Sequence, residues 1–461
     1  MGDYSRDDMK RINYYIEENR SRFIDELFQF IRQPSVSTRN EGIQSCAELL
    51  AGFMTKVGIK VQIFKKSHHP IVYGEIIKEG QPTVLIYGHY DCQPPEPLDQ
   101  WTSPPFEPMI RNGKIYGCGS SDNKGQLFTY LKAVETLIQV EGSVPLSLKF
   151  LFEGEEEIGS PSLKPFAINH RQLLKADLAL YSDSHIHESG KPLLILGFKG
   201  MLYVELIVRI GSRDLHSMQA TSIPNPAWQL VWALSTLKDR SNHILIPGFY
   251  DAVAEPTPLE RKMVAQIPYD EQSLLNHFGI KDFLPGRDNS NYYMNLIFEP
   301  TCNIAGIVSG YVDPGAKTVL PALASAKIDF RLVPNQEPMD ILDKLNHYLE
   351  QQGFKDIKIV PHMFIEPSRT PIEHPAVEII KCSIRQVYGE DPLVLPNTGA
   401  SGPNYIFTGL LGQPCFLIPY ATCDQNNHAP NENMNLESFF KGIYTGITLI
   451  QNLAKSSSFR D

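Results

Sequence analysis

Five polar segments of this 461-residue chain carry side chains that could bind metal ions, and each lies at or near the end of a predicted strand. Their candidate ligands are two histidines and three carboxylates: His89, Asp122, Glu157, Asp183 and His428. Oxygen and imidazole ligands without thiolates suit Zn²⁺, Mn²⁺ or Co²⁺. This set suffices for two divalent cations that share one bridging carboxylate.

Taken singly, each segment has an ordinary structural explanation. His89 with Asp91 could be a surface pair without a ligand, and Asp122 in a glycine-rich turn could cap a helix. The four glutamates within residues 153–157 could form a solvated loop. However, like charges at a strand end repel, and only a cation or protonation removes that cost. The combination therefore indicates one shared metal site.

The charges of this set also indicate a hydrolytic reaction. Two divalent cations carry four positive charges, and three carboxylates neutralise three of them. The remaining positive charge could be balanced by a hydroxide formed at neutral pH. Glu156 stands beside Glu157. A carboxylate in that place can take a proton from water and pass it to a leaving amine, which is the chemistry of peptide or amide hydrolysis.

The elements that must position these side chains alternate between helix and strand. Helical periodicity is found at residues 8–32, 47–57, 125–140, 376–387 and 436–453, and strand-like apolar runs at 61–64, 71–76, 83–87, 146–152, 176–181 and 415–418. This alternation predicts an α/β fold with a mostly parallel sheet. Ligands bind such sheets beyond the carboxyl ends of the strands, where the candidate residues lie.

The middle of the chain has a different pattern and is predicted to be an insert. Strands are expected at residues 201–210, 326–332 and 357–360, and helices at 226–238 and between the last two strands. A long polar excursion covers residues 241–300. We therefore expect a discontinuous catalytic domain (1–199 and 371–461) that is interrupted by a second domain (200–370).

Composition narrows the possible partners and the compartment. Lys and Arg number 42 against 52 Asp and Glu, a net charge of −10 that disfavours nucleic acid and anionic membranes as partners. No apolar run is long enough for a membrane-spanning helix. Seven scattered cysteines without a Cys-x-x-Cys pair indicate a reducing compartment, so a cytoplasmic location is predicted.

The motifs resemble those of the co-catalytic zinc amidohydrolases and exopeptidases, a family that includes carboxypeptidase G, aminoacylase and the cytosolic and carnosine-type dipeptidases. The resemblance rests on His-x-Asp at residue 89, Ser-x-Asp-x-Lys-Gly at 120, Glu-Gly-x-Glu-Glu-x-Gly at 153, a later strand-end Asp and a C-terminal His. It implies a metallopeptidase catalytic domain with an inserted two-layer α+β domain of ferredoxin-like type, which serves as lid and dimerisation domain.

The resemblance also implies a role for each site residue. Two divalent cations per subunit would be bound, with Zn²⁺ expected and Mn²⁺ or Co²⁺ as alternatives. One cation would be held by His89 and Asp183, the other by Glu157 and His428, with Asp122 as the bridge, Asp91 orienting His89 and Glu156 as the general base. A cis peptide bond between Asp122 and Asn123 is implied as well.

Four residues of the insert and its surroundings resemble substrate-binding positions of the dipeptidase branch. His216 would donate to the tetrahedral oxyanion in the other subunit, and Thr318 would also come across a dimer. Arg331 would bind the terminal carboxylate of the substrate, and Ser401 would complete that pocket. The resemblance therefore implies that the protein is a homodimer.

Together these features predict a homodimeric, two-metal exopeptidase that acts on dipeptides or short peptides with a free carboxyl end. An N-acyl amino-acid amidohydrolase with the same metal site is the main alternative. A catalytically inactive metal-binding or scaffold protein is a further one. The expected partners are a small peptide substrate and a second copy of the chain, with neither nucleic acid nor membrane.

Overall fold

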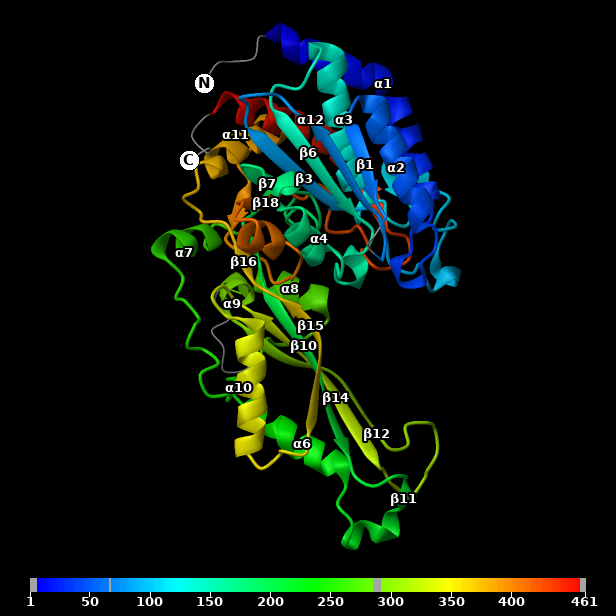
Figure 1. Cartoon of the computed structure of the whole chain (residues 1–461), viewed down its shortest axis with the longest axis vertical. Helices are drawn as coiled ribbons and strands as arrows, with labels where there is room; N and C mark the ends of the chain where they lie inside the picture. The colour runs from blue at the N-terminus through cyan, green and yellow to red at the C-terminus, as the bar shows by residue number, and fades with distance from the viewer. Residues whose placement is uncertain (1–5, 66–67, 285–291, 457–461) are drawn as a thin grey trace. The chain divides into compact units, whose positions relative to one another are not determined.

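The computed structural model describes residues 6–65, 68–284 and 292–456 (Figure 1). The chain divides into two compact units. The first contains the residues up to Gly197, Thr370–Pro396 and the residues from Ile406 onward, and the second contains Phe198–Arg369 and Asn397–Tyr405. The segment Asn397–Tyr405, which the sequence placed with the catalytic domain, thus groups with the second unit.

The first unit is built on an eight-stranded sheet. Its strands lie in the order β1 (Lys60–Phe64), β2 (Ile71–Ile76), β6 (Ser147–Glu153), β3 (Thr83–His89), β7 (Leu178–Tyr181), β18 (Cys415–Leu417), β8 (Leu193–Ile195) and β17 (Leu393–Leu395). The four central strands β6, β3, β7 and β18 run parallel to one another. This sheet confirms the predicted α/β class.

Mostly apolar sequence accompanies the burial of the central strands on both faces. Every residue of β6 is buried, and only the first residue of β3 is partly exposed. Strands of this kind need helices on both sides of the sheet. The short strands β8 and β17, three residues each, were not predicted from the sequence.

Long helices pack around this sheet (Figure 1). They are α1 (Arg6–Arg32), α2 (Ile43–Val57), α3 (Lys124–Glu141), α11 (Ala376–Tyr388) and α12 (Leu436–Lys455). Helix α3 packs against α1, α2 and α12, and α12 packs against α11. The short helices α4 (Leu163–Asn169) and α5 (Arg171–Leu174) precede β7, and a small sheet is formed by β19 (Asn433–Asn435), β5 (Lys114–Tyr116) and β4 (Met109–Arg111).

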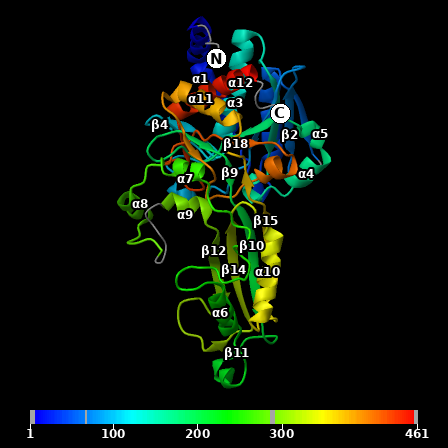
Figure 2. The ribbon, with the colours of Figure 1, turned by 90° about the vertical axis from the view of Figure 1, so that its left-hand side faces the viewer.

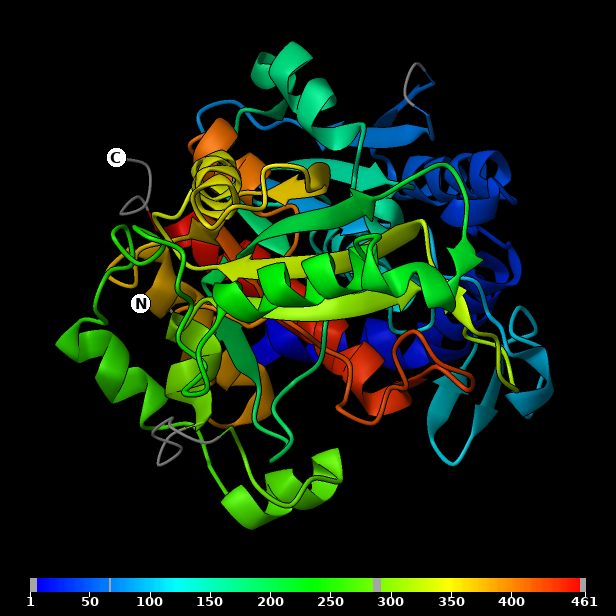
Figure 3. The ribbon, with the colours of Figure 1, turned by 90° about the horizontal axis from the view of Figure 1, so that it is seen from below.

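The second unit is a two-layer α+β structure. Its antiparallel sheet has the order β12 (Thr301–Ser309), β14 (Leu323–Leu332), β10 (Gly200–Arg209) and β15 (Lys358–Ile365). Alternate residues of β10 are buried in one core with the apolar sides of α6 (Pro226–Leu237) and α10 (Pro338–Gln351), which lie along the sheet (Figures 2 and 3). This strand order and pair of helices is the ferredoxin-like arrangement that was expected.

The sequence prediction for this insert was incomplete. It missed the edge strand β12, and the polar excursion at residues 241–300 contains helices α7 (Pro258–Val264), α8 (Glu271–Phe278) and α9 (Tyr292–Phe298). A two-stranded ribbon of β11 (Leu215–His216) and β13 (Val319–Leu320) completes the unit. The strands β9 (Gly197–Phe198) and β16 (Ser368–Arg369) lie where the chain passes between the units. Across the described ranges, no helix is long and apolar enough to cross a membrane.

Candidate active site

The candidate ligands of the first unit gather at one edge of its sheet. Strands β3, β6 and β7 are parallel neighbours, with His89 opposite Glu153 and Tyr87 opposite Tyr181. Their carboxyl ends therefore lie side by side. The loops that leave these ends carry Glu157 and Asp183, so strand register brings the segments that carry three of the five candidate ligands to the same edge.

Two groups of ligating atoms are formed, and they share one carboxylate. In the first group, the Nε2 atom of His89 lies 3.0 Å from Asp122 Oδ1 and 3.3 Å from Asp183 Oδ2. In the second group, the Nε2 atom of His428 lies 3.1 Å from Asp122 Oδ2 and 3.1 Å from Glu157 Oε2. The two oxygens of Asp122 thus face different histidines.

Asp122 is positioned by the glycine-rich turn that leads into α3. The implied cis peptide bond between Asp122 and Asn123 is present. Asn123 donates from its amide to the carbonyl of Ser182 at 2.5 Å, a bond that a carboxylate could not make, and this contact ties the turn to the residue before Asp183. Gly125 is required for close packing, because a Cβ atom there would lie 1.9 Å from the carbonyl oxygen of Ser120.

Asp91 contacts both the first histidine and the glutamate loop. Its side chain is fully buried, and its Oδ1 atom lies 3.4 Å from Nδ1 of His89. The same carboxylate accepts hydrogen bonds from the backbone N–H groups of Glu156 (3.2 Å) and Glu157 (3.1 Å). A carboxylate on the second ring nitrogen fixes the orientation of a histidine ligand. Here it also holds the loop that carries the predicted base.

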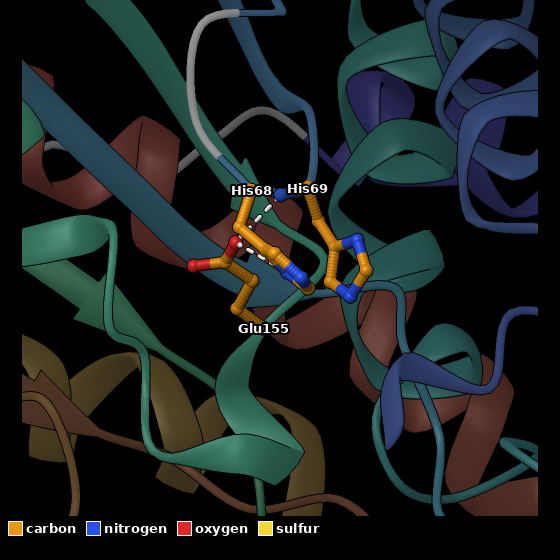
Figure 4. Close-up of side chains that lie close together, drawn as sticks. All are labelled: His68, His69 and Glu155. Atoms are coloured by element: carbon orange, nitrogen blue, oxygen red, sulfur yellow. Dashed lines mark hydrogen bonds and ion pairs between the residues drawn. The ribbon is translucent and has the colours of Figure 1, made fainter. Parts of the chain in front are cut away.

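Glu155 is an extra acid beside the predicted base, and the structure places its carboxylate in another environment (Figure 4). Its oxygens accept the backbone N–H groups of His69 (2.6 Å) and Ser162 (2.9 Å), and one of them lies 3.6 Å from Nδ1 of His68. His68, His69 and Glu155 are a third group of possible metal ligands. Both oxygens of Glu155 already accept backbone hydrogen bonds. These contacts indicate that Glu155 stabilises the surrounding loops.

The neighbouring Glu156 lies within the electrostatic influence of the ligands themselves. Burial raises its pKa well above the ordinary value for a glutamate, and the charges that act on it include those of His89, Glu157 and Asp183. Glu155 and Glu156 therefore belong to different surroundings, although they are adjacent in the chain. Of these two adjacent acids, Glu156 is the one whose ionisation is affected by the ligand residues.

The ionisable groups of the site perturb one another strongly. Burial, followed by repulsion from Asp122, raises the pKa of both Glu157 and Glu432 to about 7. Hydrogen bonds to Asp122 and Glu157 raise the pKa of His428 to about 11. Burial opposes ionisation of Asp122, but hydrogen bonds from His428 and His89 outweigh it and lower its pKa below the usual range. Such mutual perturbation is typical of functional sites.

The donor set fits a pair of divalent cations. It consists of imidazole nitrogens and carboxylate oxygens, which Zn²⁺ and similar ions accept at about 2.0–2.2 Å. The Oε1 atom of Glu157 is buried and has no hydrogen-bond partner within the described part of the chain. A buried carboxylate oxygen of this kind is costly unless it is paired or coordinates a metal.

A small pocket opens onto the second group of ligands. Asp122, Glu157 and His428 line it together with Trp101, whose indole N–H donates to the carbonyl of Pro95 at 2.7 Å. This hydrogen bond from the Trp101 indole stabilises the loop that contains Trp101. His428 is half exposed, whereas His89 is fully buried, so the second group is the more accessible of the two.

The four predicted substrate-binding residues all lie in the second unit, where they form two pairs. The Nη1 atom of Arg331 donates to Oγ of Ser401 at 2.8 Å, and Ser401 in turn donates to the carbonyl of Gly200 at 3.1 Å. Thr318 Oγ1 lies 3.4 Å from Nε2 of His216, and both of these residues are exposed.

Three residues that contact the ligands were missed by the sequence reasoning. Gln93 donates to Glu157 at 3.0 Å, Tyr181 donates to Asp183, and Glu432 accepts the backbone N–H of Asp122 at 3.0 Å. A signal existed for Tyr181, because it stands two residues before Asp183 at the end of a strand and therefore points the same way. The contact of Glu432 spans 310 residues, and no local pattern predicts it.

Comparison with known proteins identifies the family. Residues 85–452 match the model of peptidase family M20/M25/M40. The chain belongs to this family. Its fold is similar to the crystal structure of an M20 family metallo-carboxypeptidase, Sso-CP2 from Sulfolobus solfataricus, at 36% identity and a TM-score of 0.90, over 94% of this chain and 99% of the other. The predicted enzyme class, a metal-dependent peptidase, is thereby confirmed.

Two curated relatives of this M20 peptidase align along almost its whole length. The Cys-Gly metallodipeptidase dug1 of Schizosaccharomyces pombe is 29% identical over 96% of this chain and 98% of its own length. The Beta-Ala-His dipeptidase of Mus musculus is 27% identical over 98% of this chain and 96% of its own. Both relatives are dipeptidases by name, which confirms the predicted resemblance to the dipeptidase branch.

Proposed function

We propose that this M20 peptidase is a metal-dependent dipeptidase, which hydrolyses the peptide bond of dipeptides or short peptides with a free terminal carboxylate. The observation that carries the proposal is the pair of ligand groups joined through Asp122. The two dipeptidases that align along nearly the full chain support the substrate class.

In this proposal each ligand group holds one divalent cation. His89 and Asp183 would hold the first and Glu157 and His428 the second, with Asp122 contributing to both, and the short distances among these side chains support this assignment. Zn²⁺ is the proposed metal, with Mn²⁺ or Co²⁺ as alternatives. When bound, such cations polarise a peptide carbonyl and lower the pKa of water.

The remaining chemistry is assigned to side chains of the glutamate loop. Glu156 accepts a proton from the attacking water and delivers it to the amine that leaves. Asp91 holds His89 in place through its ring and holds Glu156 through its backbone N–H. A positioned general base of this kind contributes about 10²–10⁴-fold to the rate.

We assign substrate recognition to the second unit, as a lid. Arg331 binds the terminal carboxylate of the peptide, and Ser401, which it already contacts, completes that subsite. His216 donates to the oxyanion of the tetrahedral intermediate, and Thr318 stands beside it. Planar guanidinium groups bind carboxylates through two parallel hydrogen bonds, which explains a preference for a free carboxyl end.

The proposal includes a homodimer in which His216 and Thr318 of the partner subunit complete each site. The second unit offers a surface that suits this role. Trp228 and Trp232 stack on the outer face of α6 and are 58% and 55% exposed, and the edge strand β12 exposes Ile307 and Val308. Large exposed apolar side chains of this kind are typical of interaction surfaces. We place the protein in the cytoplasm, where its seven free cysteines would stay reduced.

A substrate panel tests this function. The purified protein, loaded in turn with Zn²⁺, Mn²⁺ and Co²⁺, is assayed by mass spectrometry against dipeptides, tripeptides and N-acetyl and N-succinyl amino acids. We expect turnover of dipeptides that a chelator abolishes and that added metal restores. Exclusive cleavage of the acyl amino acids would overturn the dipeptidase assignment in favour of a deacylase. Absence of turnover on every substrate, with two ions bound, would favour a scaffold protein.

A further inference from the structure

We propose that Glu432 is a positioning residue that fixes the separation between Asp122 and His428, and thereby sets the affinity for the cation that these two residues share. The inference rests on the proposed function, because it concerns the same metal centre. Glu432 itself is not assigned as a ligand.

The carboxylate of Glu432 is enclosed by donors from a single turn. It is 5% exposed. Its Oε2 atom accepts the N–H of Gly119 at 2.8 Å, and its Oε1 atom accepts the N–H groups of Ser121 at 2.9 Å and Asp122 at 3.0 Å, together with the Ser121 hydroxyl at 3.0 Å. Successive backbone N–H groups of this kind form a concavity that binds an anion. Here the anion is supplied by the chain itself.

The backbone around Glu432 strengthens the same junction. Its carbonyl accepts the N–H of Gly117 at 3.0 Å, and the strand that follows, β19, pairs with β5 just before the turn. The loop that carries His428 and the turn that carries Asp122 are thus joined side by side. Hydrogen bonds to charged acceptors are about twice as strong as neutral ones, so the Glu432 carboxylate, which accepts four hydrogen bonds, is the principal link.

The loop of His428 needs such an anchor because its conformation is unfavourable. His428 has a φ of 55°, and Asn426 and Asn431 have φ values of 54° and 63°. Left-handed backbone is uncommon for residues other than glycine, and it persists where surrounding contacts hold it. Glu432 lies four residues after His428 and fixes the end of this loop. Freed from the anchor, the loop would relax and move the imidazole.

The consequence concerns metal binding. The Nε2 atom of His428 and the Oδ2 atom of Asp122 are 3.1 Å apart, although 306 residues separate them in the chain. A cation held by both needs ligand atoms at about 2.0–2.2 Å with little freedom. We expect that loss of the anchor lowers the affinity for the cation bound by Asp122, Glu157 and His428. The affinity for the cation of the His89 group should fall less.

The test compares Glu432→Gln with Glu135→Gln in the full-length protein. Glu135 is a matched control, because it is 8% exposed, pairs with Lys132 at 2.7 Å and lies about three turns along α3 from Asp122. Both proteins are loaded with Zn²⁺ and titrated with a chromogenic chelator, and ions per subunit are counted by mass spectrometry. Thermal unfolding is recorded in parallel.

We expect that Glu432→Gln releases one of two ions at a chelator concentration about 10-fold or more below that of the parent, in the range typical of groups that position ligands. Activity lost at limiting Zn²⁺ should return at excess Zn²⁺. Glu135→Gln should lower the unfolding temperature without changing the release of either ion. Equal retention of both ions by Glu432→Gln and the parent would overturn the proposal.

A gentler variant covers the case in which Glu432→Gln does not fold. Ser121→Ala removes only the hydroxyl bond to Glu432, and a few-fold weaker retention of one ion is expected. Unchanged retention by Ser121→Ala would then overturn the proposal. If the parent protein itself holds fewer than two ions, the proposed function fails instead, so the two failures are distinguishable.

Discussion

The two units hold their candidate functional residues in opposite ways. In the first unit, His89, Asp91 and Asp122 are buried, and each makes several short contacts to strand ends or loops. In the second unit, His216 and Thr318 are exposed on a two-stranded ribbon and contact each other at 3.4 Å. The first arrangement is preorganised by the fold, whereas under the proposed function the second would acquire its remaining contacts from substrate or a second subunit.

This contrast gives a general expectation for substitutions. Changes at the sheet edge of the first unit should act on metal content, proton transfer or both. Changes in the second unit should leave the ions in place and act on substrate or on the transition state. Each of the following experiments therefore measures metal content together with kinetics.

The largest effect is expected for Asp122→Ala. The substitution removes the carboxylate whose two oxygens face the two histidines, so both ions should be lost and activity should fall to background. Metal analysis by mass spectrometry and dipeptide turnover check this. Circular dichroism should show an intact fold, and two firmly bound ions in this variant would refute the bridging role.

Glu156→Gln should lower kcat by about 10²–10⁴-fold while both ions remain. Its backbone bond to Asp91 is kept, so the loop should not move. The matched control is Glu155→Gln, which should reduce stability more than it reduces kcat. If Glu155→Gln instead removed the activity and Glu156→Gln did not, the general base would be Glu155 and the assignment to Glu156 would be wrong.

His216→Ala should lower kcat by about 10²–10³-fold, as loss of one oxyanion donor does, with metal content unchanged. A mixture with Glu156→Gln gives the decisive result. In a mixed dimer, one site combines an intact Glu156 with His216 of the partner subunit, so activity should exceed that of either variant alone. A mixture no more active than its components would show that His216 serves its own subunit or none.

Arg331→Lys should produce the smallest change, an increase in KM of about 10-fold, because a lysine keeps the charge but loses the second parallel hydrogen bond. The ions should stay bound. Dipeptide amides, which lack the terminal carboxylate, serve as the control substrate and should show no difference between the variant and the parent. An equal loss on amides would contradict carboxylate recognition by Arg331.

The sequence was sufficient for elements whose burial pattern is local. Strand β3 and helices α3 and α12 were predicted within a few residues, because continuous apolar runs and helical periodicity reflect their burial directly. Strand β12 was missed because it is an edge strand on which most residues are exposed, so no alternation marks it. Strands β8 and β17 are too short to carry a pattern.

The candidate site was predictable as a set of residue types, but its supporting contacts were not. His89 and Glu153 were expected at neighbouring strand ends, and the parallel register places them opposite each other. The bonds of Glu432 to the turn at Gly119 depend on backbone groups 313 residues away. The segment Asn397–Tyr405 joins the second unit through bonds such as that from Lys199 to the carbonyl of Ala400. Backbone donors have no sequence signature.

Asp91 couples two parts of the proposed catalytic site, the histidine ligand and the glutamate loop. One carboxylate reaches the ring of His89 and the backbone of both Glu156 and Glu157. Substitutions at Asp91 and Glu156 should therefore be epistatic, and the double variant should lose little more than the worse single one. A substitution at Asp91 is therefore expected to disturb the histidine ligand and the glutamate loop at the same time, so neither can be altered through this residue alone.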